Sequence, residues 1–293
     1  MPSRGPIPVW WLLPQGLLLV AFYAYPLVDV VRLSFTNASL LEPGYRYTLG
    51  SYLSILRRPE FYATARVTGI FVSTSIAGQL VLGFLIALLI HSGVRRGVAG
   101  TVATRTIVLT AWAIPGVLIG VIWRTLLNEG SYGIVNYLAS RTPIGSLRFL
   151  SDPQMALGSV VVANIWRGTA FSMILQYAGL QTIPADVYEA AQVDGASPLQ
   201  QLLRVTVPMM RPILFINLVL TTVATFNTFD MVLALTGGGP GRSTEVIALS
   251  VYDTIFHQFS LGRGAAIAVI LLAINLAMVI LYYRALPQED GEA

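Results

Sequence analysis

The sequence contains no cysteine and no lysine, and it is poor in charged residues of either sign. Without cysteine there are no disulfides, thiolate metal ligands or cysteine nucleophiles. Without lysine there is no Schiff-base amine and no phosphate-binding loop ending in Gly-Lys-Ser/Thr, so the chain cannot hydrolyse ATP by that route. Only two histidines, His91 and His257, are present, which leaves little for a zinc site.

Charged residues make up 11% of the 293 residues, whereas about 25% is usual in soluble domains. Hydrophobic residues make up 55%, and the mean hydropathy is +0.69. This composition predicts an integral membrane protein. All 18 basic residues are arginines, and they lie in short loops between apolar runs rather than on a basic helix face. The basic pI therefore indicates charges at the membrane edge, and no nucleic-acid partner is expected.

Long apolar runs predict an all-α, polytopic integral membrane protein with six transmembrane helices. A bilayer core about 30 Å thick needs about 20 mostly apolar residues per spanning helix. The first run is charge-free over 24 residues, longer than the apolar region of a signal peptide, so we expect it to be retained. Six spans would put both termini on one side of the membrane. The expected spans lie at about 7–31, 67–92, 104–127, 156–180, 209–235 and 264–284.

The connection over 181–208 is too polar to span a membrane, and its helix-starting and helix-ending residues predict a hairpin of two short helices. Pro184 suits the first position of one helix, and Gly195 suits a left-handed cap at its end. Ser197 reads as the N-cap of the second helix, with Gln200 completing a capping box. Periodicity alone leaves an amphipathic loop lying on the membrane surface as an equal alternative.

The same loop resembles the EAA loop of permease subunits in binding-protein-dependent ABC importers. It reads Glu-Ala-Ala at 189–191, Asp-Gly-Ala at 194–196, and then Pro208 and Pro212. One departure is Leu202, where relatives usually carry phenylalanine, so the hydrophobic plug of the hairpin is expected to be smaller. The residues that the resemblance assigns to coupling with an ATPase are Glu189, Ala190, Ala191, Asp194, Gly195, Ala196, Leu202 and Pro208.

In that family the EAA loop is cytoplasmic and docks in a cleft of the ATPase subunit. The resemblance implies that Glu189 makes the charged contact, that Ala190 and Ala191 form a close-packing surface, and that Gly195 makes the turn. Arginine counts divide almost evenly between the two sides, so orientation rests on this resemblance. It implies a multi-pass protein of the cell (inner or plasma) membrane with both termini in the cytoplasm, built as a single transmembrane permease domain over 1–293.

The resemblance also implies the partners. They would be a second homologous permease subunit, two ATPase subunits, membrane lipid, and an extracytoplasmic substrate-binding protein. That binding protein would dock near 36–66, 128–152 and 236–263. No cofactor is expected in this chain, since ATP and magnesium would be bound by the ATPase, and the chain itself is expected not to be an enzyme.

A second resemblance covers 226–256, where an aspartate is followed by Thr-Gly-Gly-Gly-Pro and a later tyrosine. This segment is similar to carbohydrate-uptake permeases of the maltose and glycerol-phosphate type. The implied cargo is a mono- or oligosaccharide or a sugar or glycerol phosphate, and the sequence does not separate them. The glycines of 237–241 lack the spacing and lysine of a nucleotide cradle, so we expect them to end a helix sharply at the outer surface. A flexible turn, on the one hand, and a hinge or docking loop for the binding protein, on the other, remain equal alternatives.

Polar residues inside the apolar runs are candidates for a substrate pathway. On the fifth expected span Val223, Phe226, Asn227 and Asp230 have the spacing of one helical face. A charge in mid-membrane is costly, so Arg167 should face the bundle interior. It could be a structural partner, for example of Asp230, or a gate contact for substrate. The candidate pathway residues are Asn164, Arg167, Phe226, Asn227 and Asp230.

Two other classes compete with the importer hypothesis. An ion-coupled secondary transporter would also have several spans and rare buried charges, and such carriers commonly show internal repeats and broken helices. No repeat is visible between the halves of this chain, and the patterned hairpin has no evident purpose in a self-contained carrier. A membrane-embedded enzyme is a weaker alternative, because no paired carboxylates, histidine cluster or activated nucleophile lie together in the apolar runs.

Overall fold

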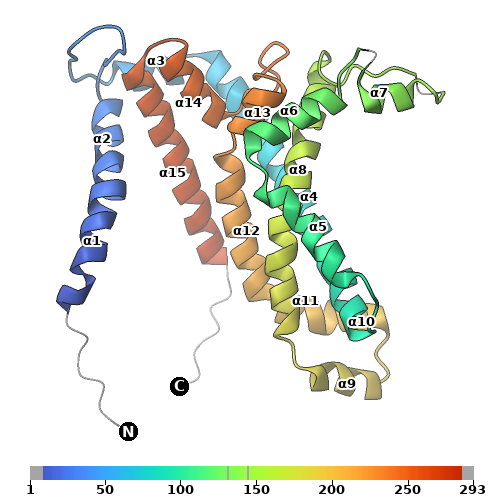
Figure 1. The fold of residues 1–293 in the computed structure, drawn as a ribbon. Helices are drawn as coiled ribbons and strands as arrows, with labels where there is room; N and C mark the ends of the chain where they lie inside the picture. The colour runs from blue at the N-terminus through green and yellow to red at the C-terminus, as the bar shows by residue number, and fades with distance from the viewer. Residues whose placement is uncertain (1–8, 131, 144, 286–293) are drawn as a thin grey trace. The chain divides into compact units, whose positions relative to one another are not determined.

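The computed structural model describes residues 9–130, 132–143 and 145–285. Regular structure in these ranges is helical, apart from one isolated antiparallel bridge between Thr36 and Tyr47. The helices in chain order are η1 (Val9–Leu12), α1 (Leu13–Leu19), η2 (Val20–Ala24), α2 (Tyr25–Ser34), α3 (Gly50–Leu56), α4 (Pro59–Arg95), α5 (Thr101–Ala113), α6 (Gly116–Leu126), α7 (Ile134–Ala139), α8 (Pro153–Gln181), α9 (Ala185–Val193), α10 (Pro198–Gln201), η3 (Leu202–Thr206), α11 (Val207–Met209), α12 (Arg211–Phe226), α13 (Asp230–Leu235), α14 (Ile247–Phe256) and α15 (Leu261–Ala285) (Figure 1). The start of the expected span 7–31 and both termini lie outside the described residues.

Several helical segments are long and apolar enough to cross a membrane, so the expected class of all-α, multi-pass membrane protein is confirmed. Four segments meet this criterion as single helices, and up to six do so if each of two bent helix pairs counts as one span. The exact number of six is therefore not decided by length and composition. The single segments are Trp10–Ser34, Pro59–Arg95, Pro153–Gln181 and Leu261–Arg284.

The third apolar run, expected as one span over 104–127, is sharply bent. Helices α5 and α6 meet at an angle of 102°. The break falls at Ile114 and Pro115, which both have extended ψ angles, of 129° and 141°. A proline disfavours helical geometry in the residue before it, so α5 ends and a new helix begins at Gly116.

The chain divides into two compact units. The first comprises Met1–Phe61 and Ser250–Ala273, and the second comprises Tyr62–Leu249 and Ile274–Ala293. Each unit therefore contains segments that are far apart in the sequence.

In the second unit, α8 packs against α5 and α12, and it also contacts α4. A Cβ on Gly83 of α4 would lie 2.5 Å from Cβ of Ser172, and one on Gly168 of α8 would lie 2.2 Å from Cδ of Gln79. Lipid gives no hydrophobic drive for helices to associate, so small residues that allow close approach stabilise such contacts. Gln79 Nε2 also donates to the backbone oxygen of Asn164 at 3.0 Å.

Two short helices of this unit, α6 and α13, pack on one another. A Cβ on Gly120 would lie 2.6 Å from the carbonyl oxygen of Met231, so only glycine fits at this crossing. Within this unit Figure 1 shows α6 and α13 side by side at one end of α8 and α12, and the α9 to α11 segment at the other end.

Candidate functional site

The connection over 181–208 folds as the expected hairpin of helices. Its first helix, α9, has Pro184 as its N-cap, one position before the place expected for this proline. Gly195 has φ +77° and ends the helix. Ala196 N donates to Ala191 O at 2.9 Å, and Gly195 N donates to Gln192 O at 3.0 Å. These two bonds form a Schellman cap, which satisfies the last carbonyls of α9 and reverses the chain.

The second helix of the hairpin begins at a complete capping box. Ser197 N donates to Gln200 Oε1 at 2.8 Å, and Gln200 N donates to Ser197 Oγ at 3.4 Å. The expected roles of both residues are confirmed. From α10 the chain continues through η3 and α11, and it then bends by 66° at Met210 to enter α12.

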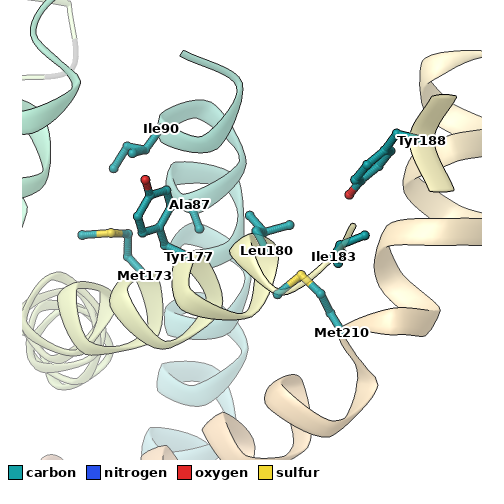
Figure 2. Close-up of a cluster of buried hydrophobic side chains, with 8 residues drawn as sticks. All are labelled: Ala87, Ile90, Met173, Tyr177, Leu180, Ile183, Tyr188 and Met210. Atoms are coloured by element: carbon teal, nitrogen blue, oxygen red, sulfur yellow. The ribbon is translucent and has the colours of Figure 1, made fainter. Parts of the chain in front are cut away.

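A buried tyrosine fastens the hairpin to the helices of the second unit. Tyr188 is only 8% exposed, its hydroxyl lies 3.0 Å from Oγ1 of Thr206, and the guanidinium of Arg95 lies 5.3 Å from its ring centroid. Ile183 and Met210 lie beside Tyr188 in the same apolar cluster (Figure 2). Tyr188 therefore connects α9 to an apolar cluster that contains residues of α4 and α8. The full cluster is Ala87, Ile90, Met173, Tyr177, Leu180, Ile183, Tyr188 and Met210.

The eight residues assigned to coupling divide into two groups of four by exposure. On the exposed surface of α9 and its turn lie Glu189, Ala190, Asp194 and Gly195. Partly buried are Ala191, Ala196, Leu202 and Pro208. Within the described part of the chain the Glu189 carboxylate makes no ion pair or hydrogen bond, so it is available to a partner.

The second unit also contains a cavity of about 390 Å³. Side chains of α4, α5, α8, α12 and α13, with residues of the break between the last two, line it. Four of the five candidate pathway residues are brought together here, although they come from two segments 60 residues apart in the sequence. The lining residues are Gln79, Trp112, Asn164, Arg167, Gly168, Phe171, Leu220, Thr221, Ala224, Thr225, Asn227, Thr228 and Asp230.

Arg167 and Asp230 face one another across the cavity. Arg167 Nη1 lies 3.7 Å from Asp230 Oδ1, with side chains 29% and 32% exposed, so the proposed ion pair is present. The carboxylate also lies against the first residue of α6, because a Cβ on Gly116 would fall 2.0 Å from Asp230 Oδ2. A helix N-terminus carries partial positive charge, so it stabilises the carboxylate together with the guanidinium.

The expected single helical face of the fifth span is wrong, because the helix breaks. α12 ends at Phe226, and α13 begins at Asp230. In the break, Asn227 Nδ2 donates to Val223 O at 2.7 Å, and Thr228 Oγ1 donates to Ala224 O at 3.0 Å. Such side chains compete with the backbone for hydrogen bonds, which favours a helix end. Phe226 is 9% exposed and does not line the cavity, whereas Asn227 and Asp230 do.

The cavity combines hydrogen-bonding groups with aromatic faces. Asn164 Nδ2 is buried and has no hydrogen-bond partner within the described residues. Trp112 and Phe171 lie with ring centroids 6.0 Å apart and an interplanar angle of 31°. Sequence reasoning missed both rings and Gln79, although a glutamine in the middle of a charge-free run was a usable signal. The lining can hold a ligand that carries both hydroxyl groups and apolar faces.

The glycine-rich segment after α13 ends this helix sharply, as expected. Gly237 has φ +62°, and its N–H donates to Leu233 O at 3.0 Å. Beyond it Thr244 Oγ1 donates to Gly239 O at 2.8 Å and lies 2.7 Å from Oγ1 of Thr236. These bonds give the segment a defined conformation, which argues against a flexible turn.

Glu129 joins the two ends of the loop over 128–152, one of the loops expected to dock the binding protein. Its carboxylate accepts hydrogen bonds from Ser151 Oγ at 2.5 Å, Ser151 N at 2.7 Å and Leu150 N at 2.8 Å. The bond from the Ser151 side chain is the main reason why the pKa of Glu129 lies below its ordinary value. The loop is therefore held together at neutral pH, and this contribution is lost as the pH falls through the lowered pKa. The described residues contain no group of acidic or histidine side chains that could hold a metal ion.

Comparisons with known proteins find relatives that are similar over nearly the whole chain. The chain is 32% identical to the trehalose/maltose transport system permease protein MalF of Thermococcus litoralis, over 93% of this chain and 91% of that protein. It is also 32% identical to the sn-glycerol-3-phosphate transport system permease protein UgpA of Brucella abortus, over 95% of this chain and 94% of that one. Both likenesses extend over nearly the full length of each protein.

The fold is similar to a chain of a bacterial alginate ABC transporter crystallised with an alginate pentasaccharide-bound periplasmic protein. The TM-score is 0.80 with 22% identity, over 93% of this chain and 91% of that chain. The model of the family described as binding-protein-dependent transport system inner membrane component matches residues 79–288, which carry both the hairpin and the cavity. The chain therefore belongs to the family of binding-protein-dependent transport system inner membrane components.

Proposed function

We propose that this chain is the permease subunit of an ATP-driven sugar importer and that the α9 hairpin couples it to the ATPase. The main support is the hairpin itself, which presents an unpaired carboxylate on its surface and is fastened by Tyr188 to the transmembrane helices. ATP hydrolysis belongs to two partner subunits, since the chain has no lysine for a phosphate-binding loop. The chain itself is not an enzyme and binds no cofactor.

Coupling is mechanical. Closure of the ATPase subunits around nucleotide moves α9, and the apolar cluster passes this movement to α4, α8 and the start of α12. Glu189 makes the charged contact with the ATPase, and Ala190, Ala191 and the Gly195 turn allow the two surfaces to approach closely. Asp194, Ala196, Leu202 and Pro208 belong to the same docking surface and its support.

Replacing Glu189 with alanine should abolish coupling without unfolding the chain. Glu189 is exposed, and the loss of one partner of a charge pair in an interface costs about 2–5 kcal/mol, which corresponds to at least a tenfold loss. The measurement is ATP hydrolysis stimulated by the loaded binding protein, with uptake into proteoliposomes. Gln192→Ala, an exposed substitution on the same helix, is the matched control. Equal behaviour of the two variants would contradict the role of Glu189.

The cavity is proposed as part of the sugar pathway, with Asn164, Arg167, Asn227 and Asp230 in its wall. Arg167 is already paired with Asp230, so the lining presents no uncompensated charge. This balance favours a neutral sugar over a phosphate ester, which would need a free cation. Two curated relatives are a trehalose/maltose permease and a trehalose permease, SugA of Mycobacterium tuberculosis, which is 32% identical over 92% of this chain.

Truncation of Trp112 to alanine should weaken sugar recognition more than it affects folding. The ring supplies an apolar face to the cavity and is 55% exposed, so its loss is expected to raise the KM for uptake about tenfold. Trp112→Phe should retain most of the affinity. Trp11→Ala, an exposed tryptophan outside the cavity, serves as control. An unchanged KM for Trp112→Ala, at normal yield, would remove this ring from the pathway.

The proposed topology has six spans, at 7–31, 67–92, 104–127, 156–180, 209–235 and 264–284, in one permease domain over 1–293. Both termini and the hairpin 181–208 would be cytoplasmic. Support comes from two arginines on either side of the short connection between α4 and α5. The guanidinium of Arg95 lies over the ring of Tyr188, and that of Arg105 lies 5.8 Å from the ring centroid of Tyr177. Cations gathered beside the hairpin favour the cytoplasmic side.

The proposed assembly contains a second permease, two ATPases and a binding protein docked on the outer loops near 36–66, 128–152 and 236–263. The apolar part of the segment Trp10–Ser34 has no buried residue. Its surface is therefore available for contact with lipid or with the second permease. The competing hypothesis is an ion-coupled carrier that works without an ATPase. Purification of the tagged chain from native membranes with mass spectrometry decides between them: a retained ATPase supports the importer, and ion-driven uptake by the chain alone contradicts it.

A further inference from the structure

A second depression, of about 710 Å³, lies entirely in the first unit. Its residues belong to the loops 36–66 and 236–263 proposed above for docking, and none of them lines the proposed sugar cavity. Its lining joins the loop after α2 and helix α3 to the residues that begin α15, about 200 residues later in the sequence. The lining residues that matter here are three arginines, Arg46, Arg58 and Arg263, with Asn37 and Ser260 beside them.

Several backbone hydrogen bonds hold the two distant segments together. Gly262 N donates to Ala38 O at 2.9 Å, and Leu40 N donates to Phe259 O at 2.9 Å. A Cβ on Gly262 would lie 2.2 Å from Thr36 O, so glycine is required where the segments meet. The site is therefore built into the fold of this unit, and it does not depend on free loop movement.

The depression carries uncompensated positive charge. No aspartate or glutamate is among its lining residues, and none of the three arginines forms an ion pair within the described part of the chain. Arg58 and Arg263 both line the depression, so their like charges repel each other. Asn37 Oδ1 accepts from Arg46 N at 2.7 Å, which leaves the amide NH₂ of Asn37 as a further donor. The site therefore offers donors and cations with no carboxylate among its lining residues.

The depression lies at the level where transmembrane helices end. The span Trp10–Ser34 ends three residues before Asn37, and the span Leu261–Arg284 begins directly after Ser260. Spans end at the boundary between hydrocarbon and water, which is where lipid phosphates lie. Tyr45 and Tyr47, aromatic residues of the same loop, are exposed beside it, as is typical of a membrane interface.

We propose that this depression binds a phosphate group. A tetrahedral phosphate offers several oxygens in different directions, so it can accept from three guanidiniums at once, whereas a carboxylate has only two oxygens. Guanidinium groups bind phosphate through paired hydrogen bonds, and a bound anion offsets the like charges of the arginines that line the depression. The phosphate can be the headgroup of an anionic phospholipid or a free phosphate.

The test uses the full chain with its co-purifying subunits, in phosphatidylcholine nanodiscs with or without phosphatidylglycerol. Native mass spectrometry after release into detergent measures retained phosphatidylglycerol. A second arm measures binding of inorganic phosphate and its competition with the lipid. Each loss of one arginine, Arg263→Gln or Arg58→Gln, should weaken binding about fivefold. Arg57→Gln, beside Arg58 but outside the lining, is the matched control.

The outcomes separate the two sources of phosphate. Retention of phosphatidylglycerol that resists inorganic phosphate assigns the lipid, whereas saturable binding of inorganic phosphate without the lipid assigns a free phosphate. Arg263→Lys should bind more strongly than Arg263→Gln, since it keeps the charge. If Arg263→Gln does not fold, the exposed Arg46→Gln takes its place. Equal losses in Arg57→Gln and the pocket variants, or binding of neither probe, would overturn the proposal.

Discussion

Asp230→Ala is expected to lower both the stability of the folded chain and its transport activity strongly. The substitution leaves the Arg167 guanidinium inside an apolar segment without its counter-charge. An unpaired arginine at the centre of a membrane helix costs about 3 kcal/mol on insertion scales. Partial exposure of both side chains reduces the expected loss to about 2 kcal/mol. The measurements are thermal unfolding in detergent and sugar uptake.

A double-mutant cycle separates the ion pair from other effects of the substitution. Arg167→Gln combined with Asp230→Asn removes both charges, so stability should return to near that of the wild type. A double variant that loses as much as both single variants together would show that the two charges are not coupled. Arg167→Ala distinguishes the roles left open for this arginine: unchanged transport affinity with a reduced yield would exclude a contact with substrate.

The second large effect is expected at Tyr188, the buried anchor of the hairpin. Truncation of a buried aromatic side chain to alanine costs about 3–5 kcal/mol, and here it would empty the centre of the contact between α9 and the transmembrane helices. Tyr188→Ala should therefore uncouple ATP hydrolysis from uptake as well as lower the unfolding temperature. ATPase activity and uptake measured on the same proteoliposomes reveal the uncoupling.

Two milder substitutions control this prediction. Tyr188→Phe keeps the ring and loses only the hydroxyl bond to Thr206, which is expected to cost about 1 kcal/mol and to leave coupling intact. Val193→Ala changes a side chain on the same helix that is 88% exposed, and it should have little effect. If Tyr188→Ala kept the wild-type ratio of transport to ATP hydrolysis, the cluster would not transmit the movement.

The hairpin was predictable from sequence because short-range bonds form it. Ser197 and Gln200 cap each other three residues apart, and Gly195 takes a left-handed conformation that other residues avoid. Neither feature depends on a distant part of the chain. The sequence could not supply the anchor. Tyr188 belongs to one apolar cluster with Met210 and Ala87 because α9, α4 and the start of α12 converge there.

Helix breaks were harder to predict than helix positions. The apolar runs continue across both breaks, so hydropathy alone favoured straight spans. Pro115 offered a local signal for the first break. At the second, Asn227 and Thr228 have only weak local preferences against a helix, and the resulting bend separates Phe226 from the cavity while Asp230 stays in its wall.

The amino-acid sequence by itself determined the membrane class, the approximate apolar segments and the capped hairpin, because composition and local hydrogen bonding decide these features. Only the tertiary structure decided which polar residues meet. Gln79, Asn164 and Asp230 line one cavity because helices approach closely at glycines. Arg58 and Arg263 line another site because backbone hydrogen bonds join two segments that are far apart in the sequence. Such contacts depend on packing between residues far apart in the chain, which no local pattern encodes.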